Sequence, residues 1–548
     1  MATPFISDLD APLLQLTSKD FFTLRQAVQG VSVMGGIGSG KTSGAGRALA
    51  GAYLRAGMGG LVLCAKPEEV ELWKDYCKQH GREDSMILFD STQGCNFISY
   101  EFARKGGAEA ASSVTDTLMK ILEAADLAAG QQAGKAGEAF WTKTARQMMM
   151  YAISGLYAAT GNATANDIVR FITTMPTKAP TTEEEKAKLD ENFAVGILHK
   201  MRTNPARTIP DDLKEQTISY WRIEWLGYPE KTRGSILAHV TSNLNRFNTG
   251  MLRKCFCDKT TIVPEMTMAG AVVILALPVL SHNEDGIVAQ QLFKFLWQRA
   301  VESRNGLAPQ FRDRAVFLYA DESQYFTSTY DDQFLSTCRG SKACPVYMTQ
   351  SLPTYYSMLG KEKSDAVDGF LGKFNTHIFH LNPDPRTNAY ASSLIGRGIQ
   401  QRRSGNETTG SSKQHGRNYG GSESDSYTLG DSENQGSQSG SSGSGWFLAD
   451  NFNSGSNKGV GTNRSLGNQR GKNYGYNSGG GTNQSATSGF SETMENLVES
   501  NFFSQKLITG GPENNFQCTA LLFRAGAKFK RPMPGVSDNV ILATFNQR

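Results

Sequence analysis

Residues 35–42 read Gly35-Gly-Ile-Gly-Ser-Gly-Lys-Thr42, or GGIGSGKT, and match the pattern G-x-x-x-x-G-K-[ST] at every fixed position. The apolar run GVSVM precedes this stretch, and the segment SGAGRALAGAYLRAG, rich in small residues, follows it. A strand, a glycine-rich turn and a helix in this order place backbone N–H groups at a helix N-terminus, where they can bind phosphate. The stretch therefore predicts a phosphate-binding loop made of Gly35, Gly36, Gly38, Ser39, Gly40, Lys41 and Thr42.

Two side chains of this loop have expected roles toward ATP. We expect Lys41 to reach the outer phosphates and Thr42 to supply a hydroxyl ligand to Mg²⁺. Hydrolysis needs a second element, and RAVFLYADES supplies an apolar strand that ends in Asp321 and Glu322. Asp321 is expected to hold the Mg²⁺ through water, and Glu322 to polarise the attacking water.

Two polar residues downstream are further candidates. Gln350 ends the strand-like run in VYMTQS, where a residue that senses the outer phosphate would lie, because ligands bind at the carboxyl ends of parallel strands. Arg339, in STCRGSKACP, has two interpretations. It either forms an ordinary surface ion pair or serves as an arginine finger that completes a neighbouring subunit's site.

Composition limits the class of protein. The 548 residues carry a formal net charge of +4, which is too small to indicate a partner by itself. The eight cysteines include no CxxC spacing, so they indicate reduced cytosolic thiols rather than a structural zinc site. The first residues, MATPFISDLD, do not resemble a signal peptide, and the most apolar run, GAVVILALPVL, is too short for a membrane span. We therefore expect a cytoplasmic protein.

The pattern along the chain predicts several segments. Continuous apolar runs separated by helical stretches are typical of a mostly parallel sheet covered on both faces, so the core is expected to be α/β. Helical periodicity dominates from about residue 105 to 250, and a Gly/Ser/Asn-rich composition from 400 to 490 predicts disorder. The predicted division is 1–104 and 251–399 for the nucleotide-binding domain, 105–250 for an all-α domain, 400–490 for the disordered insertion, and 491–548 for a segment that returns to the core.

Several motifs together resemble one family. Seven stretches are similar to motifs of the type IV coupling proteins of conjugation. They are the phosphate loop, AKPEE, AFWTKTARQMM, KTRGSILAHVTSNLNRF, YADESQYF, LSTCRGSKACPVYMTQSLPTYY and TGGPEN. Type IV coupling proteins are hexameric motor ATPases of the FtsK–HerA kind. The resemblance covers nearly the whole chain apart from the Gly/Ser-rich insertion.

This resemblance implies a homo-hexameric ring with RecA-like motor domains and all-α domains, which pumps DNA or delivers a relaxase or effector protein to a secretion channel and its ATPases. It assigns Lys41 and Thr42 to phosphate and metal, and Asp321 and Glu322 to metal and water. It also assigns Arg339 to the intersubunit finger and Gln350 to the sensor. ATP and Mg²⁺ are the implied substrate and cofactor.

The chain departs from the family pattern in two places. Many members begin with transmembrane helices, whereas no such segment is visible here, so attachment at the inner membrane is expected to depend on partners. The AKPEE stretch lacks the acidic residue expected before the lysine and the glycine expected after it, which leaves Lys66, Glu68 and Glu69 without a role. Two alternatives to a DNA translocase also stay open: a nucleotide-switched adaptor that recruits proteins, and a HerA-like pump for DNA processing or defence.

Overall fold

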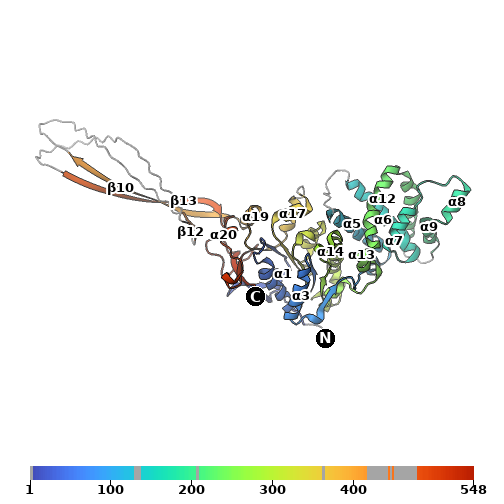
Figure 1. The fold of residues 1–548 in the computed structure, drawn as a ribbon, viewed down its shortest axis with the longest axis horizontal. Helices are drawn as coiled ribbons and strands as arrows, with labels where there is room; N and C mark the ends of the chain where they lie inside the picture. Colours follow the sequence, from blue (N-terminus) through green and yellow to red (C-terminus); the bar gives the residue numbers. More distant parts are fainter. Residues whose placement is uncertain are drawn as a thin grey trace, which may run out of the picture. The chain divides into compact units, whose positions relative to one another are not determined.

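The computed structural model describes residues 4–128, 138–204, 209–360, 364–415, 442–444, 447–449 and 478–548. The chain forms two compact units (Figure 1). The first contains residues 1–391, 500–531 and 538–548, and the second contains 392–499 and 532–537. The candidate site lies entirely within the first unit.

A nine-stranded sheet forms the core of the first unit, in the order β15-β14-β9-β3-β8-β7-β4-β6-β5. The seven strands from β9 to β5 pair in parallel, and β14 and β15 add an antiparallel edge. The predicted α/β fold with a mostly parallel sheet is thus confirmed. The strands are β3 (Val31–Met34), β4 (Gly59–Leu63), β5 (Met86–Phe89), β6 (Val272–Leu275), β7 (Val316–Ala320), β8 (Ala343–Thr349), β9 (Thr376–Phe379), β14 (Gln517–Arg524) and β15 (Val540–Asn546).

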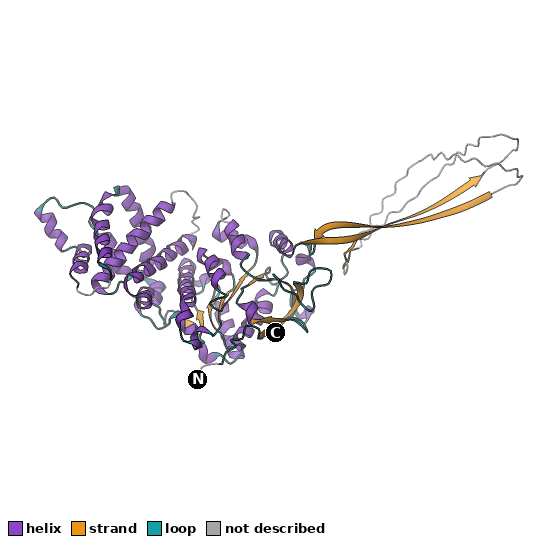
Figure 2. Ribbon diagram, turned by 180° about the vertical axis from the view of Figure 1, so that it is seen from behind, coloured by secondary structure: helices purple, strands orange, loops and turns teal. Residues whose placement is uncertain are grey.

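Burial explains the apolar runs of the sequence. Every residue of β3, β4, β6, β7, β8 and β9 is buried, because helices cover both faces of the sheet (Figure 2). The helices in the chain outside 97–253 are α1 (Leu24–Ala27), α2 (Arg47–Arg55), α3 (Pro67–Gln79), α14 (Val279–Glu302), α15 (Pro309–Arg312), α16 (Thr329–Thr337), α17 (Leu352–Leu359), α18 (Ser364–Leu371), α19 (Pro385–Ile395, which continues into the second unit) and α20 (Phe502–Gln505). A small hairpin of β1 (Pro12–Gln15) and β2 (Phe21–Thr23) precedes them.

Between β5 and β6 the described residues are helical. The helices are α4 (Phe97–Lys105), α5 (Gly107–Ala128), α6 (Glu138–Thr160), α7 (Ala165–Thr174), α8 (Glu183–Asp190), α9 (Phe193–Thr203), α10 (Asp211–Ser219), α11 (Trp225–Gly227), α12 (Glu230–Leu244) and α13 (Gly250–Arg253). The Arg299 guanidinium of α14 donates to the carbonyl of Ser113 in α5 at 3.3 Å, which ties these helices to the sheet region. Both regions fall in one compact unit, so the separate all-α domain at 105–250 stays a prediction.

In the second unit, part of 400–490 is described as paired strands, and the disorder of this insertion stays a prediction. Strands β10 (Arg397–His415) and β13 (Ser478–Asn496) pair antiparallel along their whole length, and β11 (Ser442–Ser444) pairs with β12 (Phe447–Ala449). An antiparallel ladder joins backbone groups and requires no buried side chains, so a composition poor in apolar residues does not exclude it. The remainder of the predicted disordered insertion lies outside the described residues.

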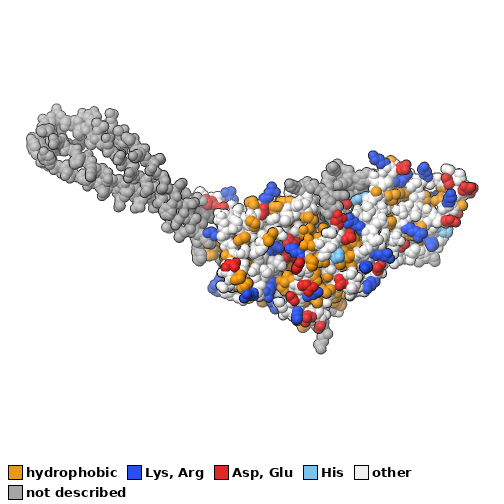
Figure 3. Space-filling model, in the orientation of Figure 1, with side chains coloured by type: hydrophobic (Ala, Val, Ile, Leu, Met, Phe, Trp, Pro, Cys, Tyr) orange, Lys and Arg blue, Asp and Glu red, His pale blue; other side chains and the backbone are white. Residues whose placement is uncertain are grey.

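Charged side chains of both signs are interspersed over the face of the molecule drawn in Figure 3, in keeping with the small net charge.

One ion pair is instead fully buried in the first unit. The Lys294 ammonium of α14 donates to the Asp331 carboxylate of α16, and the two side chains are 1% and 0% exposed. Asp331 also accepts a hydrogen bond from the Gln298 amide at 2.8 Å and one from the Tyr347 hydroxyl. This network connects α14 and α16 to β8.

Replacing Lys294 with methionine should lower the free energy of unfolding by about 3–5 kcal/mol, because the Asp331 carboxylate would stay buried without its cation. Lys373→Met is the matched control. Lys373 pairs with Asp332, which lies in α16 next to Asp331, but the side chains of Lys373 and Asp332 are both exposed to solvent. That change should cost less than about 1 kcal/mol. Denaturant unfolding measures both changes. If the two variants lost the same free energy of unfolding, burial would not set the strength of the Lys294–Asp331 contact.

Candidate nucleotide-binding site

The loop that follows β3 has the backbone conformation that the glycine pattern predicts. Gly38 and Gly40 have φ values of +72° and +88°, which side-chain-bearing residues rarely adopt. A Cβ atom on Gly40 would also lie 2.6 Å from the Cys518 Sγ of β14. A helix begins at Lys41 with a π-helical turn and continues as α2. The loop therefore ends at a helix N-terminus, as phosphate binding requires.

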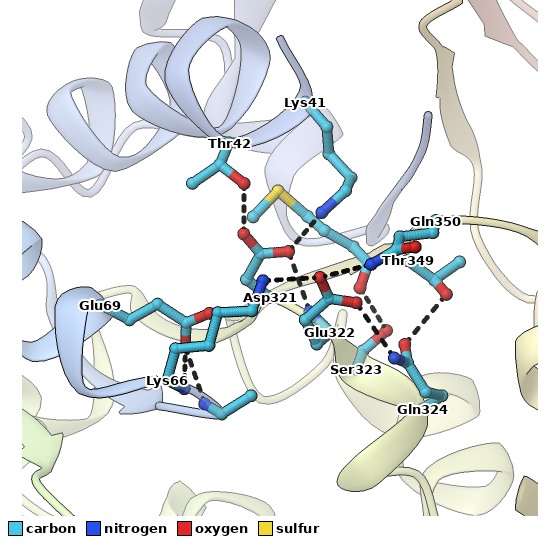
Figure 4. Close-up of polar contacts among 12 residues, drawn as sticks. Lys41, Thr42, Lys66, Glu69, Asp321, Glu322, Ser323, Gln324, Thr349 and Gln350 are labelled. Carbon is cyan, nitrogen blue, oxygen red and sulfur yellow. Dashed lines mark hydrogen bonds and ion pairs between the residues drawn. The ribbon is translucent and has the colours of Figure 1, made fainter. Parts of the chain in front are cut away.

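Lys41 and Thr42 both contact Asp321, the residue that follows β7 (Figure 4). The Lys41 ammonium lies 2.6 Å from Oδ1 of Asp321, and both side chains are 7% exposed. The Thr42 hydroxyl donates to Oδ2 of the same carboxylate. β3 and β7 are both neighbours of β8, which brings their carboxyl ends to the same edge of the sheet. Residues separated by 280 positions thereby form one cluster.

The Glu322 carboxylate has donors on both of its oxygens. Oε1 accepts from the Lys66 ammonium at 3.1 Å and from the Gln350 amide at 3.0 Å. Oε2 accepts from the Gln324 amide at 3.0 Å, and the Gln324 carbonyl accepts from the Thr349 hydroxyl at 3.0 Å. The carboxylate is thus held in one orientation.

Electrostatics keep Glu322 ionised. Burial raises its pKa, but the nearby Lys41 ammonium and the hydrogen bonds from Gln324, Gln350 and Lys66 outweigh that effect and lower the pKa to about 2. Glu322 also adopts a left-handed conformation with φ of +49°, which is uncommon outside glycine and is found at functional sites. The carboxylate is therefore charged at neutral pH and held by a constrained backbone.

Glu69, in α3, lies behind this cluster. Its carboxylate accepts hydrogen bonds from the backbone N–H groups of Ala65 and Lys66, at 2.7 and 3.3 Å. Burial and the negative charge of Asp321 raise the pKa of Glu69 to about 8. The contacts of Glu69 fix the backbone from which the Lys66 side chain extends.

A cavity of about 400 Å³ opens beside these groups. Its wall combines the phosphate loop, α3, the ends of β7 and β8, and the C-terminal segment. The lining residues are Gly36, Ile37, Gly38, Ser39, Gly40, Lys41, Thr42, Ser43, Arg47, Lys66, Leu72, Asp75, Tyr76, Gln79, Glu322, Gln350 and Gln547. Its position and its cationic loop suit the triphosphate of a nucleotide.

The structure brings together every predicted site residue except one. Gly35 adjoins the cavity through Gly36, and Asp321 meets it through Lys41 and Thr42. Arg339 is exposed and precedes β8, at the amino ends of the parallel strands, whereas the cavity lies at their carboxyl ends. It does not line the cavity of its own chain.

Sequence reasoning missed several residues of the site. Lys66 and Glu69 had an available signal, because they directly follow an apolar strand at the predicted phosphate-binding edge. Gln324 lies two residues beyond Glu322 and could have been found in the same way. Gln547, whose amide donates to the Ser43 hydroxyl at 2.9 Å, had no local signal, since only the antiparallel pairing of β14 and β15 brings it there.

A family model described as "Type IV secretory system Conjugative DNA transfer" matches residues 11–427. The chain belongs to this family. The expectation of a coupling protein of conjugative DNA transfer is therefore confirmed at the level of the family. No curated protein matches the chain.

Solved structures with a similar fold include the conjugative coupling protein TrwBdeltaN70 in its unbound monoclinic form. It is 12% identical, with a TM-score of 0.52, and the match covers 99% of this chain and 90% of that one. At this identity the likeness supports the RecA-like fold alone. TrwB in complex with ADP and Mg²⁺ is 14% identical over 72% of this chain and 80% of that one, with a TM-score of 0.44. VirB4 of Thermoanaerobacter pseudethanolicus is 12% identical over 67% and 80% of the two chains, with a TM-score of 0.39.

Across the described ranges, none of the helices combines the length and the apolar character that crossing a membrane requires.

Proposed function

We propose that this chain is an ATP-driven motor that moves DNA for conjugative transfer. One observation carries the proposal: in a chain of the conjugative DNA transfer family, a single cavity brings together five of the predicted site residues. They are Lys41, Thr42, Asp321, Glu322 and Gln350. This is the set of groups that phosphoryl transfer to water needs, namely phosphate ligands, a metal-binding carboxylate and a residue that orients water.

Each residue has a distinct task in this proposal. The loop N–H groups and the Lys41 ammonium bind the phosphates and stabilise the negative charge that develops during transfer. The Glu322 carboxylate accepts a hydrogen bond from the attacking water and orients it toward the outer phosphate. The Gln350 amide, at the end of β8, contacts the outer phosphate and responds to its loss.

The residues present also fit a magnesium ion. Mg²⁺ in nucleotide sites is held by one or two protein oxygens together with substrate phosphates and water, and the Thr42 hydroxyl and Asp321 carboxylate offer such oxygens side by side. The ion supplies charge neutralisation to the phosphates when it is bound. The Thr42 oxygen would hold the ion through a lone pair while its hydroxyl hydrogen donates to Asp321, and the Lys41 ammonium, which has three donors, would bind the phosphates.

The proposal is tested by steady-state ATP hydrolysis of the purified full chain, titrated with single- and double-stranded DNA at low salt. Strong stimulation by DNA that a Glu322→Gln sample lacks would support a nucleic-acid motor. Hydrolysis at one rate with and without DNA would contradict the coupling to DNA and favour a nucleotide-switched adaptor.

The proposal includes a homo-hexameric ring in which Arg339 completes the neighbouring subunit's site. Two features support it: the Arg339 side chain is exposed, and it lies at the sheet edge opposite its own cavity. An arginine supplied by another subunit stabilises transition-state charge and can raise turnover by about 10³–10⁵. Residues 105–250 would form the all-α domain that receives a relaxase or effector, and the ring would meet channel ATPases at the inner membrane.

We expect Arg339→Ala to lose hydrolysis and to regain part of it when mixed with Lys41→Ala subunits. In mixed rings, an intact Lys41 on one subunit can face an intact Arg339 on the next. Arg312→Ala, at an exposed arginine before β7, is the matched control and should hydrolyse ATP normally. Mixed rings without any recovery of activity would refute the intersubunit role.

A further inference from the structure

Lys66 occupies a position that the proposed mechanism leaves unexplained. It directly follows β4 and the apolar turn Cys64-Ala65, and it is the residue from which α3 begins. Its ammonium lies 3.1 Å from Oε1 of Glu322, yet its side chain is 44% exposed and lines the nucleotide cavity. The group that contacts the proposed water-orienting residue is thus also open to a ligand.

The two oxygens of Glu322 differ in the kind of donor they hold. The donor on Oε2 is Gln324, which is 7% exposed, is fixed in turn by Thr349, and does not line the cavity. The donors on Oε1 are Lys66 and Gln350, and both line the cavity. Only the Oε1 donors can therefore turn toward a bound nucleotide while Glu322 keeps its orientation through Oε2.

The charges of the cavity give Lys66 a reason to turn. The two lysines that line the cavity are paired with acids, Lys41 with Asp321 and Lys66 with Glu322. The outer phosphate of ATP carries more negative charge than a carboxylate and offers three oxygens. A lysine ammonium on a flexible stem can move from the weaker to the stronger acceptor. Because ADP lacks this group, it gives Lys66 no such acceptor.

We propose that Lys66 senses the outer phosphate: it pairs with Glu322 while that position is empty and transfers to the phosphate when ATP is bound. The transfer frees Oε1 of Glu322 to accept a hydrogen bond from the attacking water. After hydrolysis and release of phosphate, Lys66 returns and holds the carboxylate in its resting arrangement. Lys66 is a positioning residue toward Glu322, and this inference rests on the proposed function.

The competing explanation is that Lys66 only fixes the Glu322 side chain. The two explanations differ in nucleotide binding, because a sensor contacts ATP but not ADP, whereas a fixed structural contact is the same with either nucleotide. The affinity ratio between an ATP analogue and ADP therefore separates them without reference to turnover.

The test compares the binding of ADPNP and of ADP, each with Mg²⁺, to the full-length wild type and to Lys66→Met, Lys66→Arg and Lys74→Met. Lys74 is the matched control because it lies on the same helix and pairs with Glu71 away from the cavity. We expect Lys66→Met to weaken ADPNP binding by about tenfold or more and ADP binding by less than about twofold, as the loss of one charge-assisted contact predicts. Lys66→Arg and Lys74→Met should keep the wild-type ratio.

A second measurement uses Glu322→Gln. Removing the Glu322 charge should release Lys66 and raise the affinity for ADPNP relative to ADP, and this gain should vanish in the Lys66→Met, Glu322→Gln double variant. An unchanged ADPNP/ADP ratio in Lys66→Met, whether both affinities fall together or neither falls, would overturn the sensor role. Failure of the wild type to bind either nucleotide would instead overturn the proposed function itself.

Discussion

Replacing Glu322 with glutamine is expected to lower the ATP turnover rate by about 10²–10⁴-fold, the usual contribution of a positioned acid–base group. In the proposed function the carboxylate orients the attacking water, and a glutamine of the same shape lacks the charge that this contact requires. ATP should bind at least as tightly as to the wild type, because no phosphate ligand is removed. The variant is therefore expected to accumulate with ATP bound, which rapid quenching and separation of bound nucleotide would measure.

Glu68→Gln is the matched control for this change. Glu68 is an exposed carboxylate that does not line the cavity, two residues from Lys66 in the same stretch. Its turnover should equal that of the wild type. Near-normal turnover in Glu322→Gln would contradict the assignment of Glu322 as the water-orienting group.

Replacing Lys41 with alanine should weaken ATP binding by about 10²–10⁴-fold. Two lost hydrogen bonds from an ammonium to phosphate correspond to about 3–6 kcal/mol. Titration calorimetry with ADPNP would measure the loss. Lys74→Ala serves as the control on the surface of α3 and should bind with wild-type affinity.

Lys41→Ala also leaves the Asp321 carboxylate without its buried cation. Thermal unfolding without nucleotide should therefore accompany the titration, so that the binding of a folded variant is compared. Wild-type affinity for ADPNP in a folded Lys41→Ala protein would show that the loop does not bind the phosphates as proposed.

The sheet and the phosphate loop were predictable because their signals are local. The central strands are buried on both faces, so they are mostly apolar in the sequence, and the loop has glycine where φ is positive. The polar residues at the ends of β7 and β8 could be placed at one edge because parallel strands align their carboxyl ends.

The remaining features depend on contacts between distant parts of the chain. The sequence of AKPEE does not reveal that Lys66 reaches Glu322, because that distance is set by the pairing of β4 with β7. Gln547 reaches the loop only because β15 pairs with β14 at the sheet edge. The long ladder of β10 and β13 was missed because composition reports the capacity to bury side chains, whereas this ladder is made by backbone pairing.

The most direct test of a DNA-moving motor is ATP-dependent displacement of streptavidin from biotinylated DNA ends by the purified chain. We predict displacement with ATP by the wild type, none with ADPNP, and none by Glu322→Gln with ATP. The contradicting result would be ATP hydrolysis that is stimulated by DNA but is not accompanied by displacement of streptavidin from either end of single- or double-stranded DNA. It would show that this site does not power movement along DNA.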